Sequence, residues 1–331
     1  MNRNYRGAGL AIVVVDYGSS ALLAENLVAV EVELPEAVFV VVHNPTTTAE
    51  RLAVDELGAQ RGWTLVHPDH NLGFGGGVNL GVGKVLADSA ITEIMLLNPD
   101  ATIDAPSTTL LVERVRNDNA ALVGPMIRRP DGRPWSSGHL LSLGSGVMRS
   151  LSSPEPADDA GPWMPWLSGA CLVLSTELWR RVAGFDHQYF LYWEDVDLSK
   201  RVLDAGGSIV FVADALAVHD EGGTHDDGSG GSRAKSPTYY YYNILNRLRF
   251  AAIHLDVVRR RHWVRTSPRA SWQILLRGGR RQFVHPVAPL GAAWRGHRDG
   301  CALVKHAAAP PEPYGGHNTG TDPSRAEEEH A

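Results

Sequence analysis

Cysteine is scarce in this chain of 331 residues, which contains only Cys171 and Cys301. Neither has the short spacing of a zinc site, and a single pair cannot form the disulfide framework of a small secreted domain. We therefore expect a reducing compartment, which for this chain means a cytoplasmic location. No run of apolar residues reaches the ~18–20 residues that a membrane-spanning helix needs. The apolar run Leu10–Val15 is too short for a signal peptide.

Two common phosphate-binding motifs are also missing. Glycines occur at Asn71–Gly81, but their spacing does not match the G-x-G-x-x-G dinucleotide fingerprint, and no Gly-Lys-Ser/Thr of a Walker P-loop occurs. The net charge of −6 does not favour nucleic acid as the main partner. However, residues 239–306 hold 13 lysines and arginines against two acidic residues. A basic block on an acidic body indicates an anionic surface as a partner.

Strand and helix patterns alternate through the first hundred residues. Short β-branched runs are typical of strands that are covered on both faces, and helical segments with capping residues separate them. This alternation predicts an α/β fold, with a mostly parallel sheet between helices. Ligands bind such sheets at the carboxyl ends of the strands, where Asp16, Asn44 and Asp100 are expected to lie. The expected strands are 10–15, 37–42, 63–67 and 93–97; the expected helices are 21–30, 46–58 and 78–87, the last following a glycine loop at 71–77.

The second half is less regular, and it ends in a basic helical segment. Residues 128–165 are rich in Gly, Ser and Pro, which predicts a functional or partly mobile loop. We expect strands at 121–125, 166–174, 209–212 and 215–219, and helices at 110–117, 176–182, 195–205 and 239–255. The domains that we predict are a catalytic domain at 1–238 (donor half 1–105, acceptor half 106–238), a basic helical extension at 239–306 and a disordered tail at 307–331.

An acidic cluster within Phe190–Arg201 is the strongest chemical signal. Glu194, Asp195 and Asp197 follow an aromatic run, and buried carboxylates are costly unless a metal, a proton or a cation uses them. Acidic residues are also common in the first turn of a helix, where they complement the helix dipole.

Two further residues favour chemistry at this cluster. Asp100 follows Asn98-Pro99 at a strand end, where a carboxylate can bind Mg²⁺ or Mn²⁺. His219 ends a later strand and is a second potential ligand. The alternatives are that Asp100 only forms a turn and that His219 is structural.

Six motifs in order resemble the family 2 glycosyltransferases of the GT-A fold, particularly the rhamnosyltransferase-like branch. The motifs are VVVDYGSS, VVVHNPTTT, NLGFGGGVN, MLLNPDA, the segment Trp166–Gly207 and FVADALAVH. The resemblance spans about residues 10–250, and its most specific part is Gly169–His219. It implies a Rossmann-like nucleotide-diphospho-sugar transferase fold with a C-terminal helical extension.

The resemblance also implies a role for each matching residue. Asp195 would be the general base, with Glu194 as its catalytic neighbour, and Asp100 and His219 would bind the divalent cation, Mg²⁺ or Mn²⁺. Gly169, Ala170 and Trp193 would line the pocket for the sugar and the acceptor. The residues matching the donor site are Asp16, Tyr17, Asn44, Asn71, Gly73, Phe74, Asn79 and Asn98.

The implied activity is metal-dependent, inverting transfer of a sugar from a dTDP- or UDP-sugar to an acceptor hydroxyl. The sugar would be rhamnose, another deoxysugar or a hexose, and the acceptor a glycan, a lipid-linked sugar or a small molecule. High Ala, Gly and Arg usage is typical of a GC-rich bacterial genome, which fits cell-wall, polysaccharide or natural-product glycosylation. The chain departs from the family where His43-Asn44 replaces Asp-Asn and Asp16-Tyr17 replaces Asn-Tyr.

Alternatives remain open at this point. A sugar-1-phosphate nucleotidyltransferase would need a basic, glycine-rich loop after the first strand, and residues 16–20 contain no Arg or Lys. A sugar-nucleotide-binding module without activity would not need Asp195 and Asp100. The basic segment is either an interfacial helix at the inner face of the plasma membrane or a solvated helical cap on the catalytic domain.

Overall fold

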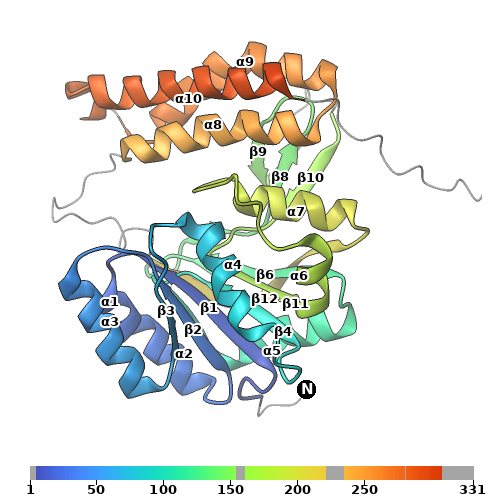
Figure 1. Ribbon diagram of the computed structural model, residues 1–331. Helices are drawn as coiled ribbons and strands as arrows, with labels where there is room; N and C mark the ends of the chain where they lie inside the picture. The colour runs from blue at the N-terminus through green and yellow to red at the C-terminus, as the bar shows by residue number, and fades with distance from the viewer. Residues whose placement is uncertain (1–4, 154–160, 221–234, 280, 308–331) are drawn as a thin grey trace, which may run out of the picture.

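The computed structural model describes residues 5–153, 161–220, 235–279 and 281–307. Figure 1 shows a twisted central sheet flanked by helices, with three long C-terminal helices stacked above it. The predicted α/β class, the helices around the sheet and the C-terminal helical extension are thereby confirmed.

The central sheet is mostly parallel. Its first half has the order β3-β2-β1-β4, all parallel, and the antiparallel strand β11 joins this half to the parallel pair β6 and β12. Residues 209–219, expected as two strands, lie in one strand with a bulge between Val212 and Leu216. The strands are β1 (Leu10–Asp16), β2 (Val38–His43), β3 (Thr64–Val66), β4 (Glu93–Leu97), β5 (Ala101–Ile103), β6 (Ala121–Arg128), β7 (Pro134–Ser136), β11 (Cys171–Ser175) and β12 (Ser208–His219).

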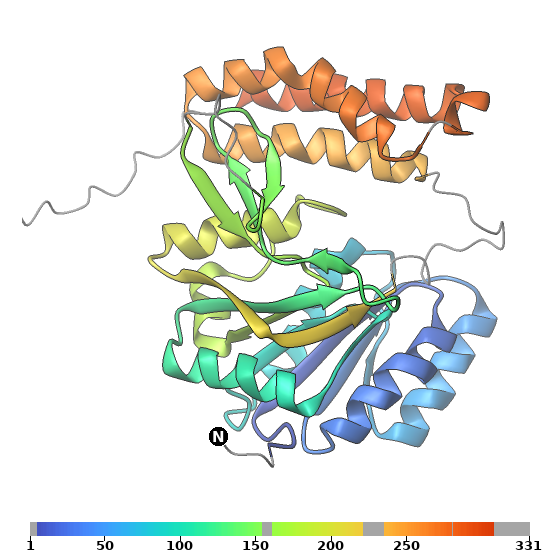
Figure 2. The same ribbon diagram turned by 180° about the vertical axis from the view of Figure 1, so that it is seen from behind.

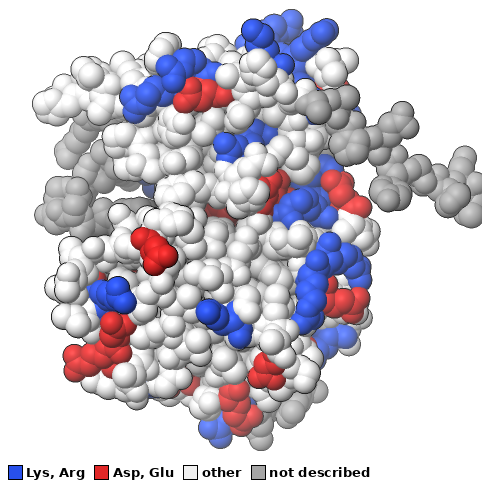
Figure 3. Space-filling view, in the orientation of Figure 1, with Lys and Arg blue, Asp and Glu red and all other residues white. Residues whose placement is uncertain are grey.

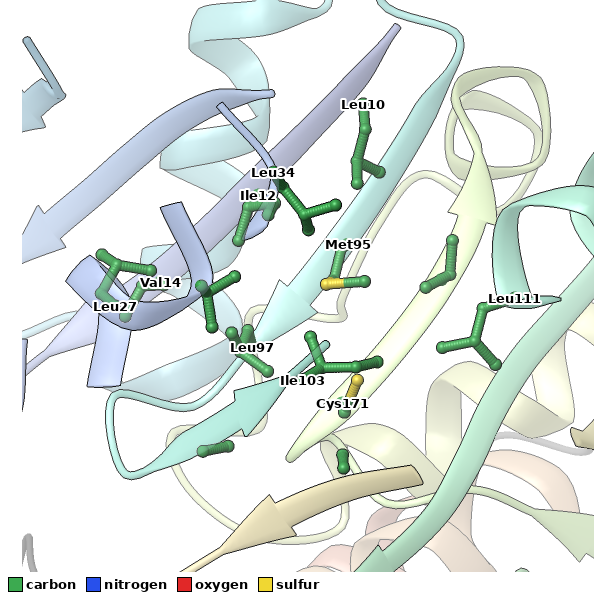
Figure 4. Packing of buried hydrophobic residues seen from close by; sticks show 14 of the residues in the cluster. Leu10, Ile12, Val14, Leu27, Leu34, Met95, Leu97, Ile103, Leu111 and Cys171 are labelled. Atoms are coloured by element: carbon green, nitrogen blue, oxygen red, sulfur yellow. The ribbon is translucent and has the colours of Figure 1, made fainter. Parts of the chain in front are cut away.

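Both faces of the sheet carry apolar cores, as the continuous apolar runs predict. In β1, Leu10, Ile12 and Val14 point into one core (Figure 4), whereas Val13 and Val15 point into the other. The covering helices are α1 (Ser20–Leu22), the π-helical turn Leu23–Leu27, α2 (Val28–Glu33), α3 (Thr48–Arg61), α4 (Gly73–Val85), α5 (Ala105–Asn117), α6 (Thr176–Val182) and α7 (Glu194–Asp204).

The glycine stretch is helical, although we expected a loop up to Gly77. Helix α4 starts at Gly73 because its glycines let it pack directly on the sheet. A Cβ on Gly77 would lie 2.8 Å from Val15, and one on Gly81 would lie 2.6 Å from Val13. The glycines therefore allow close packing within a helix, not only the flexibility of a loop.

Residues 128–165 do not form a simple loop. After β7 they build a small antiparallel sheet, β10-β8-β9, from β8 (His139–Ser142), β9 (Met148–Ser150) and β10 (Trp163–Trp166). Figure 2 shows these strands rising from the main sheet towards the C-terminal helices. These strands are too short for an alternation of apolar and polar residues to be recognised in the sequence. The abundance of glycine and serine therefore led to the prediction of a loop.

The C-terminal helices are α8 (Pro237–His254), α9 (Val257–Leu276) and α10 (Val287–His306), with the 3₁₀ turn Arg281–Val284 before α10. Helix α8 packs against both α9 and α10, and apolar residues of β8 and α7 complete this upper core. In the described part of the chain, no helix combines the length and apolar character needed to cross a membrane. The predicted disordered tail, beyond Ala307, lies outside the described residues.

Candidate active site

The acidic cluster begins where an unusual backbone turn meets helix α7. Tyr192 and Trp193 have φ of 66° and 74°, a left-handed conformation that non-glycine residues adopt only when their surroundings stabilise it. Asn246 of α8 provides such support, because its Nδ2 donates to the carbonyls of Leu191 (3.0 Å) and Tyr192 (2.9 Å). The C-terminal helices thus hold the segment that presents the cluster.

Asp195 is oriented by the backbone on both sides of its carboxylate. Its Oδ2 accepts a hydrogen bond from Gly169 N at 3.0 Å, and its Oδ1 accepts one from Val196 N at 2.8 Å. A Cβ on Gly169 would lie 3.1 Å from the Phe74 ring and 3.7 Å from the Cβ of Asp195, so this glycine keeps the carboxylate's surroundings open.

The two neighbouring acids have different proton affinities. Burial raises the pKa of Asp195 to about 6, although hydrogen bonds from Gly169 and Val196 oppose the shift. Burial and the charge of Asp195 raise the pKa of Glu194 to about 8. Burial thus raises the pKa of both acids, and the pair holds a proton up to a higher pH than two exposed carboxyl groups would.

Asp197 is structural. It is fully buried and pairs with Arg201 Nε and His254 Nε2, each at 2.7 Å. Burial alone would raise the pKa of Asp197, but the hydrogen bond from His254 and the charge of Arg201 outweigh burial and lower it. The interpretation of Asp197 and Arg201 as an i,i+4 pair is confirmed, and the pair with His254 ties α7 to α8.

Asp100 and His219 lie together at the sheet edge. His219 Nε2 is 3.0 Å from Asp100 Oδ1 and 3.4 Å from Asn98 Nδ2, because β12 pairs with β5 so that His219 faces Ala101. Both side chains are buried. Across the residues described, no group of three or more His, Cys, Asp or Glu could hold a metal ion. One carboxylate and one imidazole still fit Mg²⁺ or Mn²⁺, since such ions commonly take their other ligands from substrate phosphates and water.

Gly169 and Ala170 connect these two groups. Gly169 N contacts the carboxylate of Asp195, and the carbonyl of Ala170 accepts from Asn98 N at 3.0 Å. The expected base therefore contacts Gly169, and the strand end that precedes the expected metal ligand Asp100 contacts the next residue, Ala170. Such an arrangement can place a proton acceptor and a cation on opposite sides of a reacting sugar.

The two departures from the family pattern contact each other. His43 Nδ1 lies 2.5 Å from the carboxylate of Asp16, which also accepts from Ser19 N and Oγ. Asp16 and His43 are buried, while Tyr17 beside them is 56% exposed. The two departures from the family pattern are therefore compatible with each other, because the His43 imidazole at the end of β2 has the Asp16 carboxylate at the end of β1 as its partner.

The residues of the glycine motif hold their own segment in place. Asn44 Oδ1 accepts from Leu72 N at 2.9 Å, and Asn71 Oδ1 accepts from Gly73 N at 2.8 Å. The amide of Asn79 makes two hydrogen bonds with the backbone of Phe185, at 2.8 and 2.9 Å. These asparagines therefore brace the site, and their contact with a donor stays a prediction.

Gly73 joins helix α4 to the segment before the acidic cluster. Its φ is +69°, and an added Cβ would lie 1.8 Å from the carbonyl oxygen of Phe190, which accepts a hydrogen bond from Phe74 N. Alanine at this position would thus be strained and would displace Phe190.

We predict that Gly73→Ala lowers the free energy of unfolding by roughly 2–4 kcal/mol, measured by urea denaturation. Gly83→Ala is the matched control in the same helix, because a Cβ there meets nothing within 4 Å. That control should gain up to ~1 kcal/mol from helix propensity. Equal stability of the two variants would contradict the close approach at Phe190.

Trp193 packs against the C-terminal helices. Its ring packs between Phe250 and Trp263 of the C-terminal helices, with centroids 5.8 and 6.3 Å away, and it lines a groove beside α9. Its assignment to the sugar and acceptor pocket stays a prediction, and its position indicates the acceptor side.

The sequence reasoning did not single out three residues of α8: Asn246, Arg247 and His254. The signal was present, because Asn246 and Arg247 are adjacent polar residues in a helix whose other residues are mostly apolar or aromatic. Buried polar residues on a helix need partners, and here the partners include the segment before α7.

Comparison with known proteins connects this geometry to sugar transfer. No model of a protein family matches the chain. The chain is 29% identical over 234 residues to an N-acetylglucosaminyl-diphospho-decaprenol L-rhamnosyltransferase of Mycobacterium tuberculosis, covering 63% of this chain and 75% of that protein. It is 25% identical over 175 residues to the rhamnosyltransferase WbbL of Escherichia coli, covering 49% and 65%.

Among solved structures, the crystal structure of GalNAc-T7 with UDP, GalNAc and Mn²⁺ superposes with a TM-score of 0.60 at 14% identity. The match covers 94% of this chain and 59% of that one. At this identity, the similarity extends to the fold alone.

Proposed function

Because the chain is a glycosyltransferase of the GT-A fold that resembles the rhamnosyltransferases, we propose that it moves rhamnose from a nucleotide-diphosphate donor to a hydroxyl of a lipid-linked sugar. The observation that carries this proposal is the oriented carboxylate of Asp195 at Gly169, together with the Asp100–His219 pair that follows the strand end bonded to Ala170. Both the mycobacterial and the Escherichia coli relative support rhamnose as the sugar, and the name of the mycobacterial one supports an N-acetylglucosaminyl-diphospho-decaprenol as the acceptor. We place this reaction in cell-wall or polysaccharide synthesis.

The proposed reaction is a single in-line displacement that inverts the anomeric carbon. The acceptor oxygen forms a bond to that carbon as the bond to the diphosphate oxygen breaks. Asp195 takes the proton of the acceptor hydroxyl, and its negative charge also stabilises positive charge on the sugar ring in the transition state. Burial and the charge of Asp195 raise the pKa of Glu194, which disfavours a second negative charge beside the base.

Asp100 and His219 would hold a divalent cation, Mg²⁺ or Mn²⁺, on the donor side. When bound, the cation neutralises charge on the leaving diphosphate. Asn98 lies within 3.4 Å of His219 and would orient its ring. The donor nucleotide, dTDP or UDP, would lie across the ends of β1 and β2, near Tyr17 and the buried Asp16–His43 pair.

The direct test is a transfer assay with the purified full chain. dTDP-rhamnose and UDP-sugars are offered with an N-acetylglucosaminyl diphospholipid acceptor and Mg²⁺ or Mn²⁺, and the product is identified by mass spectrometry and by the anomeric configuration in NMR. If the anomeric configuration of the transferred sugar differs between donor and product, the result supports inversion. If the anomeric configuration is the same in both, the result contradicts inversion. Nucleotide-sugar binding without transfer to any acceptor would favour the alternative of a binding module.

We also propose peripheral contact with a membrane through the α9–α10 hairpin. Exposed apolar residues recur at helical spacing on α9 (Trp272, Leu276) and on α10 (Val287, Leu290, Trp294). Figure 3 shows Lys and Arg side chains around this upper part of the molecule, separated by uncharged surface. Apolar and basic residues together favour an anionic lipid surface.

The protein should therefore co-sediment with anionic vesicles at low salt, and less at high salt. Trp272→Ser with Trp294→Ser should weaken this binding about tenfold or more, because both rings lie in the exposed patch. Leu52→Ser, at an exposed apolar residue of α3, is the matched control and should bind like the unaltered protein. If the protein sediments to the same extent with and without vesicles, the membrane proposal fails, and the C-terminal helices form only a solvated cap on the catalytic domain.

A further inference from the structure

A basic groove runs along one face of helix α9. The groove, of about 860 Å³, lies between α9, α8 and the turn between β8 and β9. Along α9 its lining residues recur every three or four positions, as one helical face requires: Arg259, His262, Thr266, Arg269, Gln273 and Arg277. No aspartate or glutamate is among the lining residues that the structure describes.

The basic side chains of this groove are poorly neutralised. Arg259 pairs with Asp256 at 3.2 Å. Arg269 and Arg277 are exposed, and neither has an ion-pair partner among the residues with described positions. The groove therefore keeps a positive potential that attracts a multivalent anion.

Arg247 of α8 adds a buried cation to the same groove. It is 4% exposed, donates to the carbonyls of Ser145 (3.0 Å) and Trp263 (3.4 Å), and stacks on the Trp263 ring at 4.4 Å. Two carbonyls use only part of its five N–H donors. Burial lowers the pKa of Arg247 to about 10, as expected for a guanidinium without a carboxylate partner. A buried cation of this kind is costly unless an anion joins it.

The groove leads to the catalytic turn. Trp193 lines the groove and immediately precedes Glu194 and Asp195. The opposite end, at Arg277, lies next to the exposed apolar residues Trp272 and Leu276 on the same helix. An acceptor with a sugar, a diphosphate and an apolar chain, in that order, matches the order of base, cationic groove and apolar patch.

We propose that this groove binds the diphosphate of the lipid-linked acceptor, with Arg247, Arg269 and Arg277 as its phosphate-binding residues. This proposal rests on the proposed function, and it adds a charged subsite for the acceptor that is separate from the donor site. Guanidinium groups suit this task because they bind phosphate oxygens in a bidentate geometry.

The test compares two soluble acceptors in the transfer assay with the full chain. One is N-acetylglucosaminyl diphosphate with a short isoprenyl chain, and the other is octyl N-acetylglucosaminide, which lacks the diphosphate. Arg269→Gln with Arg277→Gln should raise the KM of the diphosphate acceptor roughly 10- to 100-fold. The KM of the nucleotide-sugar and the rate with the octyl glycoside should not change.

Arg265→Gln is the matched control, because Arg265 is an exposed arginine of α9 outside the groove. It should leave the KM of the diphosphate acceptor within about twofold of the unaltered value, as expected for a screened surface charge. An equal rise of this KM in the control and the double variant would overturn the site.

Two binding measurements separate the remaining outcomes. Calorimetric titration with inorganic pyrophosphate tests the groove even if no sugar transfer occurs, so failure of the proposed function is recognised independently. Pyrophosphate binding that the double variant retains in full would overturn the inference. If the double variant loses anionic-vesicle binding but keeps the KM of the diphosphate acceptor, the groove binds a phospholipid headgroup instead, which also overturns it.

Discussion

Replacing Asp195 with asparagine is expected to lower the transfer rate about a thousandfold, within the range of ~10²–10⁴ that a positioned general base contributes. Asparagine has nearly the same shape and can still accept from Gly169 N, so the backbone around it should persist. It cannot accept the proton of the acceptor hydroxyl. The measurement is the initial rate of sugar transfer at saturating donor, with circular dichroism to verify folding.

Asp204→Asn is the matched control for this prediction. Asp204 ends the same helix, pairs with Lys200 and is largely exposed. Its removal should leave the rate within about twofold, since exposed ion pairs contribute little. If Asp195→Asn transfers sugar at the unaltered rate, Asp195 is not the base.

The pH profile of kcat/KM gives an independent signature of the same residue. A general base acts only when deprotonated, and burial raises the pKa of Asp195 to about 6. Activity should therefore be full above about pH 7 and fall as the pH decreases through 6, approaching a tenfold loss per pH unit. A rate that stays constant down to pH 4.5 would show that the acid has an ordinary pKa or another role.

Replacing Asp100 with asparagine is expected to lower turnover roughly 100- to 1000-fold, because charge neutralisation on a leaving diphosphate supplies several kcal/mol. Asp100 and His219 are the two side chains that we assign to the cation, so the substitution removes the one charged ligand that we assign to the protein itself. The measurement is the transfer rate as a function of added Mg²⁺ or Mn²⁺, with the variant requiring higher metal concentrations.

Chelation and a control on β12, the strand that carries His219, complete this test. EDTA should abolish turnover by the unaltered protein, and added Mn²⁺ or Mg²⁺ should restore it. Asp214→Asn, at an exposed position in the bulge of β12, should behave like the unaltered protein. Donor turnover that EDTA leaves unaffected would contradict the cation.

The fold was largely predictable because its signals are local. Runs such as Leu10–Val15 are apolar on both faces, and their burial in two cores follows from that composition. The weakest predictions were in 128–165, where strands of three or four residues offer too little alternation to recognise. The glycines of α4 were also misread, since local propensity cannot show that the sheet lies close enough to exclude a Cβ.

The sequence by itself determined where chemistry could occur. The order of its motifs indicated sugar transfer, and the acids of Phe190–Arg201, Asp100 and His219 were identified as the candidate groups. These are properties of residue type and spacing, which the chain carries whatever its fold.

Only the tertiary structure shows that the three acids of the cluster have different surroundings and therefore different roles. Asp195 faces the backbone of Gly169, the buried Glu194 has a raised pKa, and Asp197 pairs with His254, 57 residues away. The charge state of a carboxylate depends on its desolvation and on its neighbours. Those neighbours come from distant segments, and the basic face of α9 likewise lies beside the catalytic turn only because α8 and α9 both pack against that turn.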